Sequence, residues 1–407
     1  AVVTWVLYGI PVADGIAAII KACTSWSTLQ LIVVMYLITF LQKMMGQRGA
    51  IDKAQKGLSS LFNNRWVNCA AAPIFIGMLP TPNAAFIAGD IVKASADKYM
   101  KHDEMAVTTT YFRHVSESFM PTYGAIILAI SLAGITAGEF VVGMLPIVAC
   151  IIASGCFWFL RGKVPMATGE AASTNKGKDV KDIFVGLWPI LAIIILVVVA
   201  KMPIYVAGAI IMVAYFFLHK FSFSEVTPNF AASLQFKLYL NTFAVMTLKE
   251  FLTASGAINA LPDFFAQLPI PTFMVFMLIF FFGSIVSGSQ TIIGLCMPVA
   301  MAAIPNAGLP AVCLLMGTTY AAMQMSPTHI CLTLTAEYFD ISLGDLIKKT
   351  MPAVATTVVS PLCFTVSVAS LSLSSRESSL ISELPQTAKR CSTPCSTCQS
   401  AYSSYVL

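Results

Sequence analysis

The chain has 407 residues, of which 57% are hydrophobic and only 11% are charged, and its mean hydropathy is +0.80. Soluble domains carry about 25% charged residues, so a water-soluble fold is excluded. The net charge of +5 is spread over short loops and forms no basic stripe, which excludes nucleic acid as a partner. The positive residues in the loops are instead interpreted as the signal that orients the chain in the membrane.

Continuous apolar runs cover residues 183–200, 206–218 and 273–286. They approach the roughly 20 apolar residues that a helix needs to cross a bilayer. Backbone amides in lipid must bond within the protein, and the runs do not alternate as barrel strands do. The sequence therefore predicts an all-α polytopic membrane protein with the bilayer as its surroundings.

The cysteines do not form a disulfide or metal framework in this interpretation. Those in or beside apolar stretches are expected to act as small hydrophobes. Three more lie in a Ser-rich tail without a nearby His, which does not complete a tetrahedral metal set. The first group comprises Cys23, Cys69, Cys150, Cys156, Cys296, Cys313, Cys331 and Cys363, and the second Cys391, Cys395 and Cys398.

The chain repeats itself at one common offset. The segment 120–123, Met-Pro-Thr-Tyr, recurs at 326–329 as Ser-Pro-Thr-His, and four further matches, two before it and two after it, keep the same order. Each half predicts a spanning helix, an amphipathic stretch, a hairpin that re-enters the membrane, a helix broken at Pro-Thr and a final spanning helix. A re-entrant hairpin crosses nothing, so each repeat has an odd number of crossings and the second copy is inverted.

Lysine and arginine distribution supports the inversion. Both sides of the first hairpin carry Lys and Arg, whereas the matching stretches 253–271 and 301–310 carry neither. Cytoplasmic loops are enriched in these residues. The first hairpin is therefore expected to enter from the cytoplasm and the second from outside.

Four regions follow from this organisation. Residues 1–162 form the first inverted repeat, which we expect to lack its N-terminal helix, and 163–182 form a polar cytoplasmic linker. Residues 183–370 form the second repeat. The Ser- and Cys-rich tail 371–407 is expected to be disordered or aberrant.

The predicted helix breaks are the candidate binding site. Broken helices expose N–H groups and positive dipole ends that suit a carboxylate, while freed carbonyl and hydroxyl oxygens suit a cation such as Na+. A Pro that merely kinks a packed helix is the alternative for each break taken alone. The candidate residues at the breaks are Thr81, Pro82, Asn83, Pro121, Thr122, Ser287, Gly288, Ser289, Gln290, Ser326, Pro327 and Thr328.

Ionisable side chains stand next to the breaks. Arg113 and Glu117 are four residues apart, so they share a helix face and can pair. Arg113 is a candidate contact for a substrate carboxylate, and His114 or Glu117 for a proton. An internal salt bridge is the alternative. His329 follows the second break, where a hydrogen-bonded structural role competes with proton carriage.

Motifs of nucleotide-driven pumps and hydrolases are absent: the sequence has no P-loop, His-Glu-x-x-His or Gly-x-Ser-x-Gly. We therefore expect no enzyme and no organic cofactor. The leading hypothesis is a secondary transporter for a small organic anion coupled to H+ or Na+. A channel would need continuous polar faces along its helices, and an intramembrane enzyme using His114 and Glu117 with a metal would need a further ligand, for which only His329 is available.

The segments 75–83, 111–117 and 326–339 resemble those of domain-of-unknown-function family 401, a prokaryotic integral-membrane family related to the gluconate permease and citrate symporter branches of the ion transporter superfamily. The resemblance covers about residues 1–370. It implies a homodimeric elevator-type carrier in the cell membrane, with Na+ and a carboxylate such as a sugar acid or a di- or tricarboxylate bound at the breaks. The tips lack the full Ser-Asn-Thr triplet of the dicarboxylate carriers. The resemblance therefore implies Na+ coupling less strongly than it implies binding of a carboxylate.

Overall fold

Every regular element of the described chain is a helix, as the uninterrupted apolar runs predict. In a computed structural model, the described residues are 11–50, 64–78, 84–166, 176–234, 236–255, 269–304, 307–327 and 329–359, with single residues in the intervening stretches. The chain divides into two units, Ala1–Pro361 and Leu362–Leu407. All described residues belong to the first unit, so the expectations for the tail 371–407 lie outside them.

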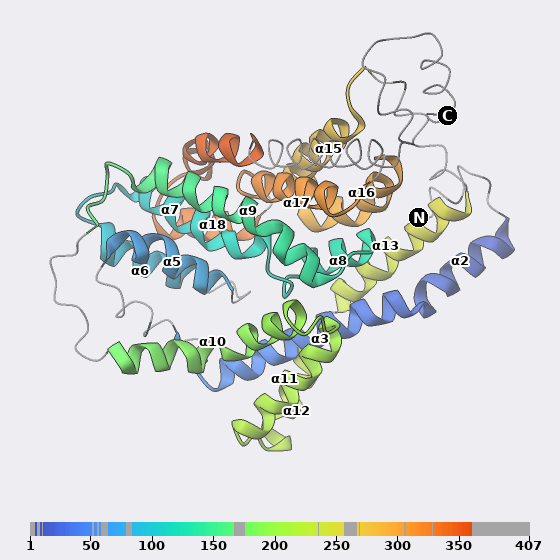
Figure 1. Cartoon of the computed structure of the whole chain (residues 1–407), viewed down its shortest axis with the longest axis horizontal. Helices are drawn as coiled ribbons and strands as arrows, with labels where there is room; N and C mark the ends of the chain where they lie inside the picture. The colour runs from blue at the N-terminus through green and yellow to red at the C-terminus, as the bar shows by residue number, and fades with distance from the viewer. Residues whose placement is uncertain are drawn as a thin grey trace, which may run out of the picture. The chain divides into compact units, whose positions relative to one another are not determined.

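The described helices follow one another along the chain (Figure 1). The first half contains α2 (Val12–Thr24), α3 (Trp26–Gln47), α5 (Arg65–Gly77), α6 (Ala84–Ala96), α7 (His102–His114), η1 (Val115–Ser118), α8 (Gly124–Ala133), α9 (Ala137–Gly155) and η2 (Cys156–Leu160). The second contains α10 (Lys176–Val198), α11 (Ile204–Leu218), α12 (Phe223–Ala232), α13 (Phe236–Ala254), α15 (Thr272–Ser287), α16 (Ser289–Ala303), α17 (Leu309–Met323), α18 (Ile330–Tyr338) and a helix over 343–359.

One order of elements occurs in both halves. A long helix, α3 or α13, precedes two helices that pack against each other, α5 with α6 and α15 with α16. A third helix, α7 or α17, packs on the first of that pair. Each is followed by a break and a short helix, α8 or α18, and then by a longer one.

Contacts divide the helices of this unit into two sets. The first set consists of α2, α3 and α10–α13, which pack mainly on one another. The second consists of α5–α9 and α15–α18, which contain both helix pairs and both breaks. The sets meet where α3 contacts α8, α13 contacts α16 and α10 contacts α9. Within the second set the halves interlock, because α6 packs on α18 and α16 packs on α8.

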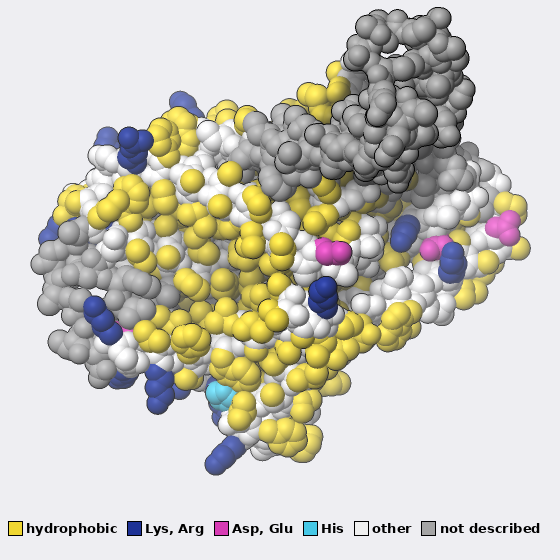
Figure 2. Space-filling view, in the orientation of Figure 1, with side chains coloured by type: hydrophobic (Ala, Val, Ile, Leu, Met, Phe, Trp, Pro, Cys, Tyr) yellow, Lys and Arg dark blue, Asp and Glu magenta, His cyan; other side chains and the backbone are white. Residues whose placement is uncertain are grey.

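Three of the described helices are long and apolar enough to cross a membrane: Trp26–Gln47, Ala137–Leu160 and Lys176–Val198. Large apolar side chains on them remain exposed, including Val142 and Leu145 of α9 and Ile195 of α10. Figure 2 shows such side chains spread over the visible face, with charged groups mostly toward its margins. An apolar exposed surface of this kind suits lipid contact.

Two helix boundaries differ from the sequence prediction. Helix α10 begins at Lys176, inside the stretch expected to be a polar linker, because exposed Lys and half-buried Asp residues extend the helix beyond its apolar run. The first break begins earlier than Pro121, since α7 already tightens into the 3-10 turn η1 at Val115. Proline removes an N–H and disfavours helix at the preceding residue, so the interruption spreads toward the N-terminus.

Candidate functional site

The first break is held against the first helix pair. Gly77 of α5 approaches α7 so closely that a Cβ there would lie 1.9 Å from the carbonyl oxygen of Arg113. Ser116 of η1 donates to the Ile74 carbonyl oxygen, and Tyr123 donates to the Gly77 carbonyl oxygen. These bonds fix the interrupted segment between α7 and α8.

The second break, between α17 and α18, is tied in a comparable way. Ser326 donates to the carbonyl oxygen of Ile285 in α15 over 2.8 Å. Gln324 donates to the hydroxyl oxygen of Tyr320 at 2.8 Å and to the Tyr111 carbonyl oxygen at 3.3 Å. A hydroxyl at each break thus bonds a carbonyl in the first helix of the preceding pair.

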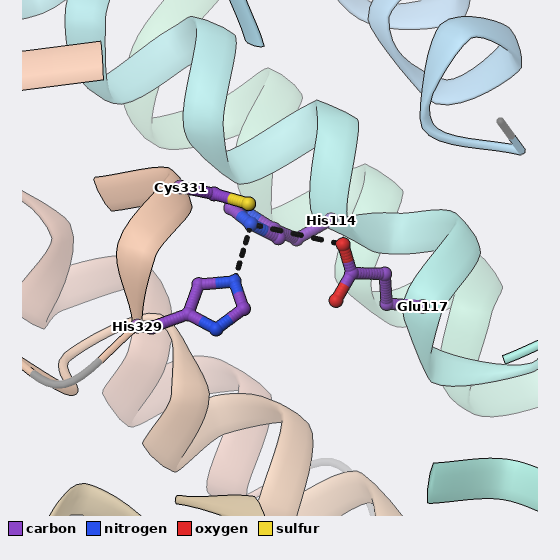
Figure 3. Close-up of side chains that lie close together, drawn as sticks. All are labelled: His114, Glu117, His329 and Cys331. Carbon is purple, nitrogen blue, oxygen red and sulfur yellow. Dashed lines mark hydrogen bonds and ion pairs between the residues drawn. The ribbon is translucent and has the colours of Figure 1, made fainter. Parts of the chain in front are cut away.

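The two breaks bring four metal-ligating side chains together. His114 ends α7, Glu117 lies in η1, His329 is the N-cap of α18 and Cys331 lies in the first turn of that helix. Their ligand atoms all lie within 4.8 Å of one another (Figure 3). His114 is fully buried, and Cys331 is 8% exposed.

Arg113 completes this group, which we call the break cluster: Arg113, His114, Glu117, His329 and Cys331. The guanidinium Nη1 lies 3.2 Å from Glu117 Oε1 and 3.0 Å from His114 Nε2. The Arg113–Glu117 pair predicted from the spacing is therefore present, with both side chains largely buried. Burying an ion pair is costly unless it is well paired, so a cluster of this kind needs a reason to persist.

The hydrogen bonds assign the His114 tautomer. Nδ1 lies 2.6 Å from the carbonyl oxygen of Thr110, which can only accept, so Nδ1 carries the proton in the neutral ring. Nε2 then presents its lone pair to the cluster. His329 Nε2 lies 2.9 Å from it, and the two rings meet edge to face.

Several buried polar atoms around the breaks have no hydrogen-bond partner among the described residues. They are Arg113 Nε, Thr122 Oγ1, Ser284 Oγ, Gln290 Nε2 and Gln324 Oε1. A buried polar group left unpaired costs about 1–3 kcal/mol. Unpartnered buried atoms also occur elsewhere in the described chain, but those at the breaks are placed where a ligand or water can supply the missing partner.

The second helix pair turns at the predicted tip. Helix α15 ends at Ser287, Gly288 adopts φ 84° in the left-handed region that favours glycine, and α16 begins at Ser289. The side chain of Gln290 then lies beside Gly124, where α8 begins. The second tip and the first break are therefore neighbours.

The structure brings some of the predicted site residues together and leaves others apart. Arg113, His114, Glu117 and His329 come together, and Gln290 lies beside Gly124 at the start of α8, two residues after the buried Thr122. Pro121 and Ser326 are buried in their breaks, and Ser289 is half-buried at the second tip. Ser287 and Pro327 are exposed, and the Ser287 hydroxyl donates to the Gly283 carbonyl oxygen of its own helix. Thr81, Pro82, Asn83 and Thr328 lie outside the described residues.

Cys331 is a candidate ligand that the sequence does not predict, because a thiol in an apolar stretch has the features of a small hydrophobe. Its position two residues after His329 was the available signal. A helix that begins at Ile330 turns residues 329 and 331 toward one end of α18, where a partner from α7 can meet both.

Together, the helical architecture of the described residues and their three helices long and apolar enough to cross a membrane are consistent with a helical membrane protein. The sequence profile of the family described as "Protein of unknown function (DUF401)" matches residues 2–367. The chain therefore belongs to the DUF401 family. No curated protein matches the chain.

Proposed function

We propose that the protein is a secondary active transporter that moves a small organic anion, of the sugar-acid or di- and tricarboxylate kind, coupled to H+ or Na+. The observation that carries the proposal is the meeting of two interrupted helices around the buried Arg113. Interrupted helices and intramembrane charge survive in membranes where they line a solute pathway.

The anion is favoured by the donors gathered at the breaks. Arg113 retains an unpartnered Nε, and Gln290 and Thr122 offer further unpartnered buried atoms. The helices α8, α16 and α18 begin there without a side-chain cap, so their first N–H groups and positive dipole ends remain available. A carboxylate satisfies all of these groups, whereas an uncharged solute leaves the dipoles and the guanidinium uncompensated.

The coupling cation is assigned to the acceptor side of the same region. Helix breaks free backbone carbonyl oxygens, and Glu117 adds a carboxylate that is 12% exposed at its side chain. Such oxygens are the ligands that Na+ prefers, and a carboxylate also accepts a proton. Thermodynamic coupling then requires only that anion and cation occupy neighbouring positions.

The duplicated order of elements supports an alternating-access cycle. We interpret the two halves as inverted repeats, with α2, α3 and α10–α13 as the scaffold and α5–α9 with α15–α18 as the transport domain of an elevator. The exchange of partners between halves, α6 with α18 and α16 with α8, is what a pseudo-two-fold relation produces. We place this carrier, as a homodimer, in the cell membrane of a prokaryote.

The test is uptake by proteoliposomes. Purified protein is reconstituted and offered a panel of radiolabelled sugar acids and di- and tricarboxylates, with and without imposed proton and Na+ gradients. We expect saturable uptake of at least one anion that accumulates only with a gradient. Uptake that never saturates and never exceeds equilibrium would indicate a passive pore and would reject the proposal.

The variants Gln290→Leu and Thr122→Val locate the site. Both remove buried polar atoms that have no partner among the described residues, so neither should destabilise the fold. A hydrogen bond to a charged group is worth about 1.5–3 kcal/mol, so we expect KM to rise about ten-fold or more. Thr319→Val is the matched control, because its buried hydroxyl bonds the Leu315 carbonyl oxygen within α17.

A further inference from the structure

The transport proposal gives no role to the thiol of Cys331 or to the apposition of two imidazoles. The Nε2 atoms of His114 and His329 face each other at 2.9 Å. Glu117 Oε1 lies 3.9 Å from His114 Nε2, and the Cys331 Sγ falls within the same 4.8 Å sphere. Nitrogen, oxygen and sulfur donors thus converge from two chain segments that are far apart in sequence (Figure 3).

We propose that these four side chains form a binding site for a divalent transition metal ion of the Zn2+ kind. The ligand atoms are His114 Nε2, His329 Nε2, a Glu117 carboxylate oxygen and Cys331 Sγ. This set matches a tetrahedral zinc site in number and type, since Zn2+ takes imidazole nitrogen, thiolate sulfur and carboxylate oxygen. Alkali and alkaline-earth cations prefer oxygen and make poor use of the thiol and the two rings.

The ligand atoms must shift to accept the ion. Bond lengths of about 2.0–2.3 Å place neighbouring ligand atoms of a tetrahedral site about 3.3–3.6 Å apart. The two imidazole nitrogens must separate from 2.9 Å, and ligand atoms up to 4.8 Å apart must close toward that spacing. Glu117 and His329 are only partly buried.

The surroundings already orient His114 as a ligand. Its Nδ1–H donates to the carbonyl oxygen of Thr110, which fixes the tautomer and aims the Nε2 lone pair at the cluster. A second hydrogen bond of this kind accompanies almost every metal-bound histidine. A structural histidine pair would need only the shared contact between the rings; it would not require the carboxylate and the thiol beside it.

Arg113 is positively charged and therefore repels any cation that binds to the break cluster. Binding converts the Cys331 thiol to a thiolate, whose proton leaves to solvent, so thiolate and carboxylate together neutralise a divalent ion. Arg113 then gives up its contact with His114 Nε2 and shares the Glu117 carboxylate with the metal. The bound ion would clamp the end of α7 to the start of α18.

The experiment measures metal binding directly on detergent-purified full-length protein prepared with a histidine-free tag. Metal-stripped protein is titrated with Co2+ and then Zn2+, and the metal content of dialysed samples is determined by mass spectrometry. We expect one ion per chain and visible Co2+ bands of a tetrahedral site. A near-ultraviolet thiolate-to-cobalt band should accompany them, and Zn2+ should bleach both.

Variants assign the ligands. Cys331→Ser should abolish the thiolate band and weaken Zn2+ binding by about ten-fold or more, and His329→Ala should reduce the stoichiometry. Cys313→Ser, which removes a buried thiol in α17, and His219→Ala, which removes a histidine next to the end of α11, should change neither. Apo thermal unfolding shows whether each variant is folded.

Two results would overturn the proposal. One is folded wild-type protein that binds no Zn2+ or Co2+ above the level of the Cys331→Ser variant. The other is Zn2+ binding whose affinity and stoichiometry are the same in wild type, Cys331→Ser and His329→Ala. Neither result bears on anion uptake, so the transport proposal stands or falls separately.

Discussion

At the scale of single residues, close backbone approach decides which side chains the chain can tolerate. Gly77 lies where α5 meets the carbonyl of Arg113, and no side chain fits between the two backbones. The same contact positions Ser116 and Tyr123 for their bonds to α5. The position of the break cluster therefore depends on a glycine at residue 77, because a Cβ there would overlap the Arg113 carbonyl oxygen.

Replacing Gly77 with Ala should lower stability, because its Cβ would overlap a backbone oxygen that cannot move alone. Overpacking of this kind costs about 1–3 kcal/mol. Gly46→Ala is the control: nothing lies within 4 Å of its added Cβ, and Ala favours the helix by about 1 kcal/mol. Thermal unfolding in detergent checks both, and an unchanged Tm for Gly77→Ala would contradict the close approach.

At the scale of elements, two ion pairs hold the start of α7. Glu104 pairs with Lys163, which follows η2, at 2.8 Å, and Asp103 pairs with Lys349 of the helix over 343–359 at 2.7 Å. Partial burial raises the pKa of each carboxyl, but the bonds and charges of the lysines outweigh it and leave both pKa values lowered. The start of α7 is thus connected to both halves of the chain.

Those lowered pKa values predict an acid-dependent loss of stability. A carboxyl whose folded pKa lies below its unfolded value, about 4, stabilises the fold above that pH and loses the contribution as pH falls through the folded pKa. The pairs are partly exposed, so the effect is about 1 kcal/mol or less for each. We expect Tm to fall between pH 7 and pH 3 by less in the Asp103→Asn/Glu104→Gln variant than in wild type. Equal falls would show that the pairs contribute nothing.

Local signals in the sequence predicted elements well. The Gly and Pro residues predicted the second hairpin tip at Gly288 and both helix interruptions, because these residues change the conformation of the backbone at and next to their own positions. The extent of the breaks was underestimated, since η1 forms through packing against α5 and not through Pro121 alone. Helix α10 likewise extends into charged residues that apolar counting had excluded.

The composition of the site was less predictable. The spacing of Arg113 and Glu117 predicted their pairing, because both lie on one continuous segment. The contact between His114 and His329 joins residues from opposite halves and depends on how α7 and α18 pack. Cys331 was missed for the same reason: a thiol in an apolar stretch is a small hydrophobe until a partner from another helix reaches it.

At the scale of the whole molecule, the proposed inverted repeats would place matching segments of the two halves on opposite sides of the membrane. Lys98 and Lys101 lie between α6 and α7, whereas residues 255–271, before α15, include no Lys or Arg. If positive flanks face the cytoplasm and a re-entrant hairpin keeps both of its flanks on one side, these two segments lie on opposite sides.

Cysteine labelling tests that orientation. In a background with the native cysteines replaced by serine, Gln267→Cys should react with a membrane-impermeant thiol reagent added to intact cells. Asp97→Cys should react only after the membrane is opened. Both side chains are exposed, so access to the reagent and not burial decides the outcome. Labelling of both positions from the same side would contradict the inversion.

Both proposals depend on one spatial claim: the end of α7 lies against the start of α18 and brings the break cluster together. A short bis-thiol-reactive cross-linker applied to the His114→Cys variant, with native Cys331 as the second thiol, measures this most directly. We expect a linked peptide pair joining residues 114 and 331, which is lost in His114→Cys/Cys331→Ser. Folded protein in which both thiols are modified singly and never linked would contradict it.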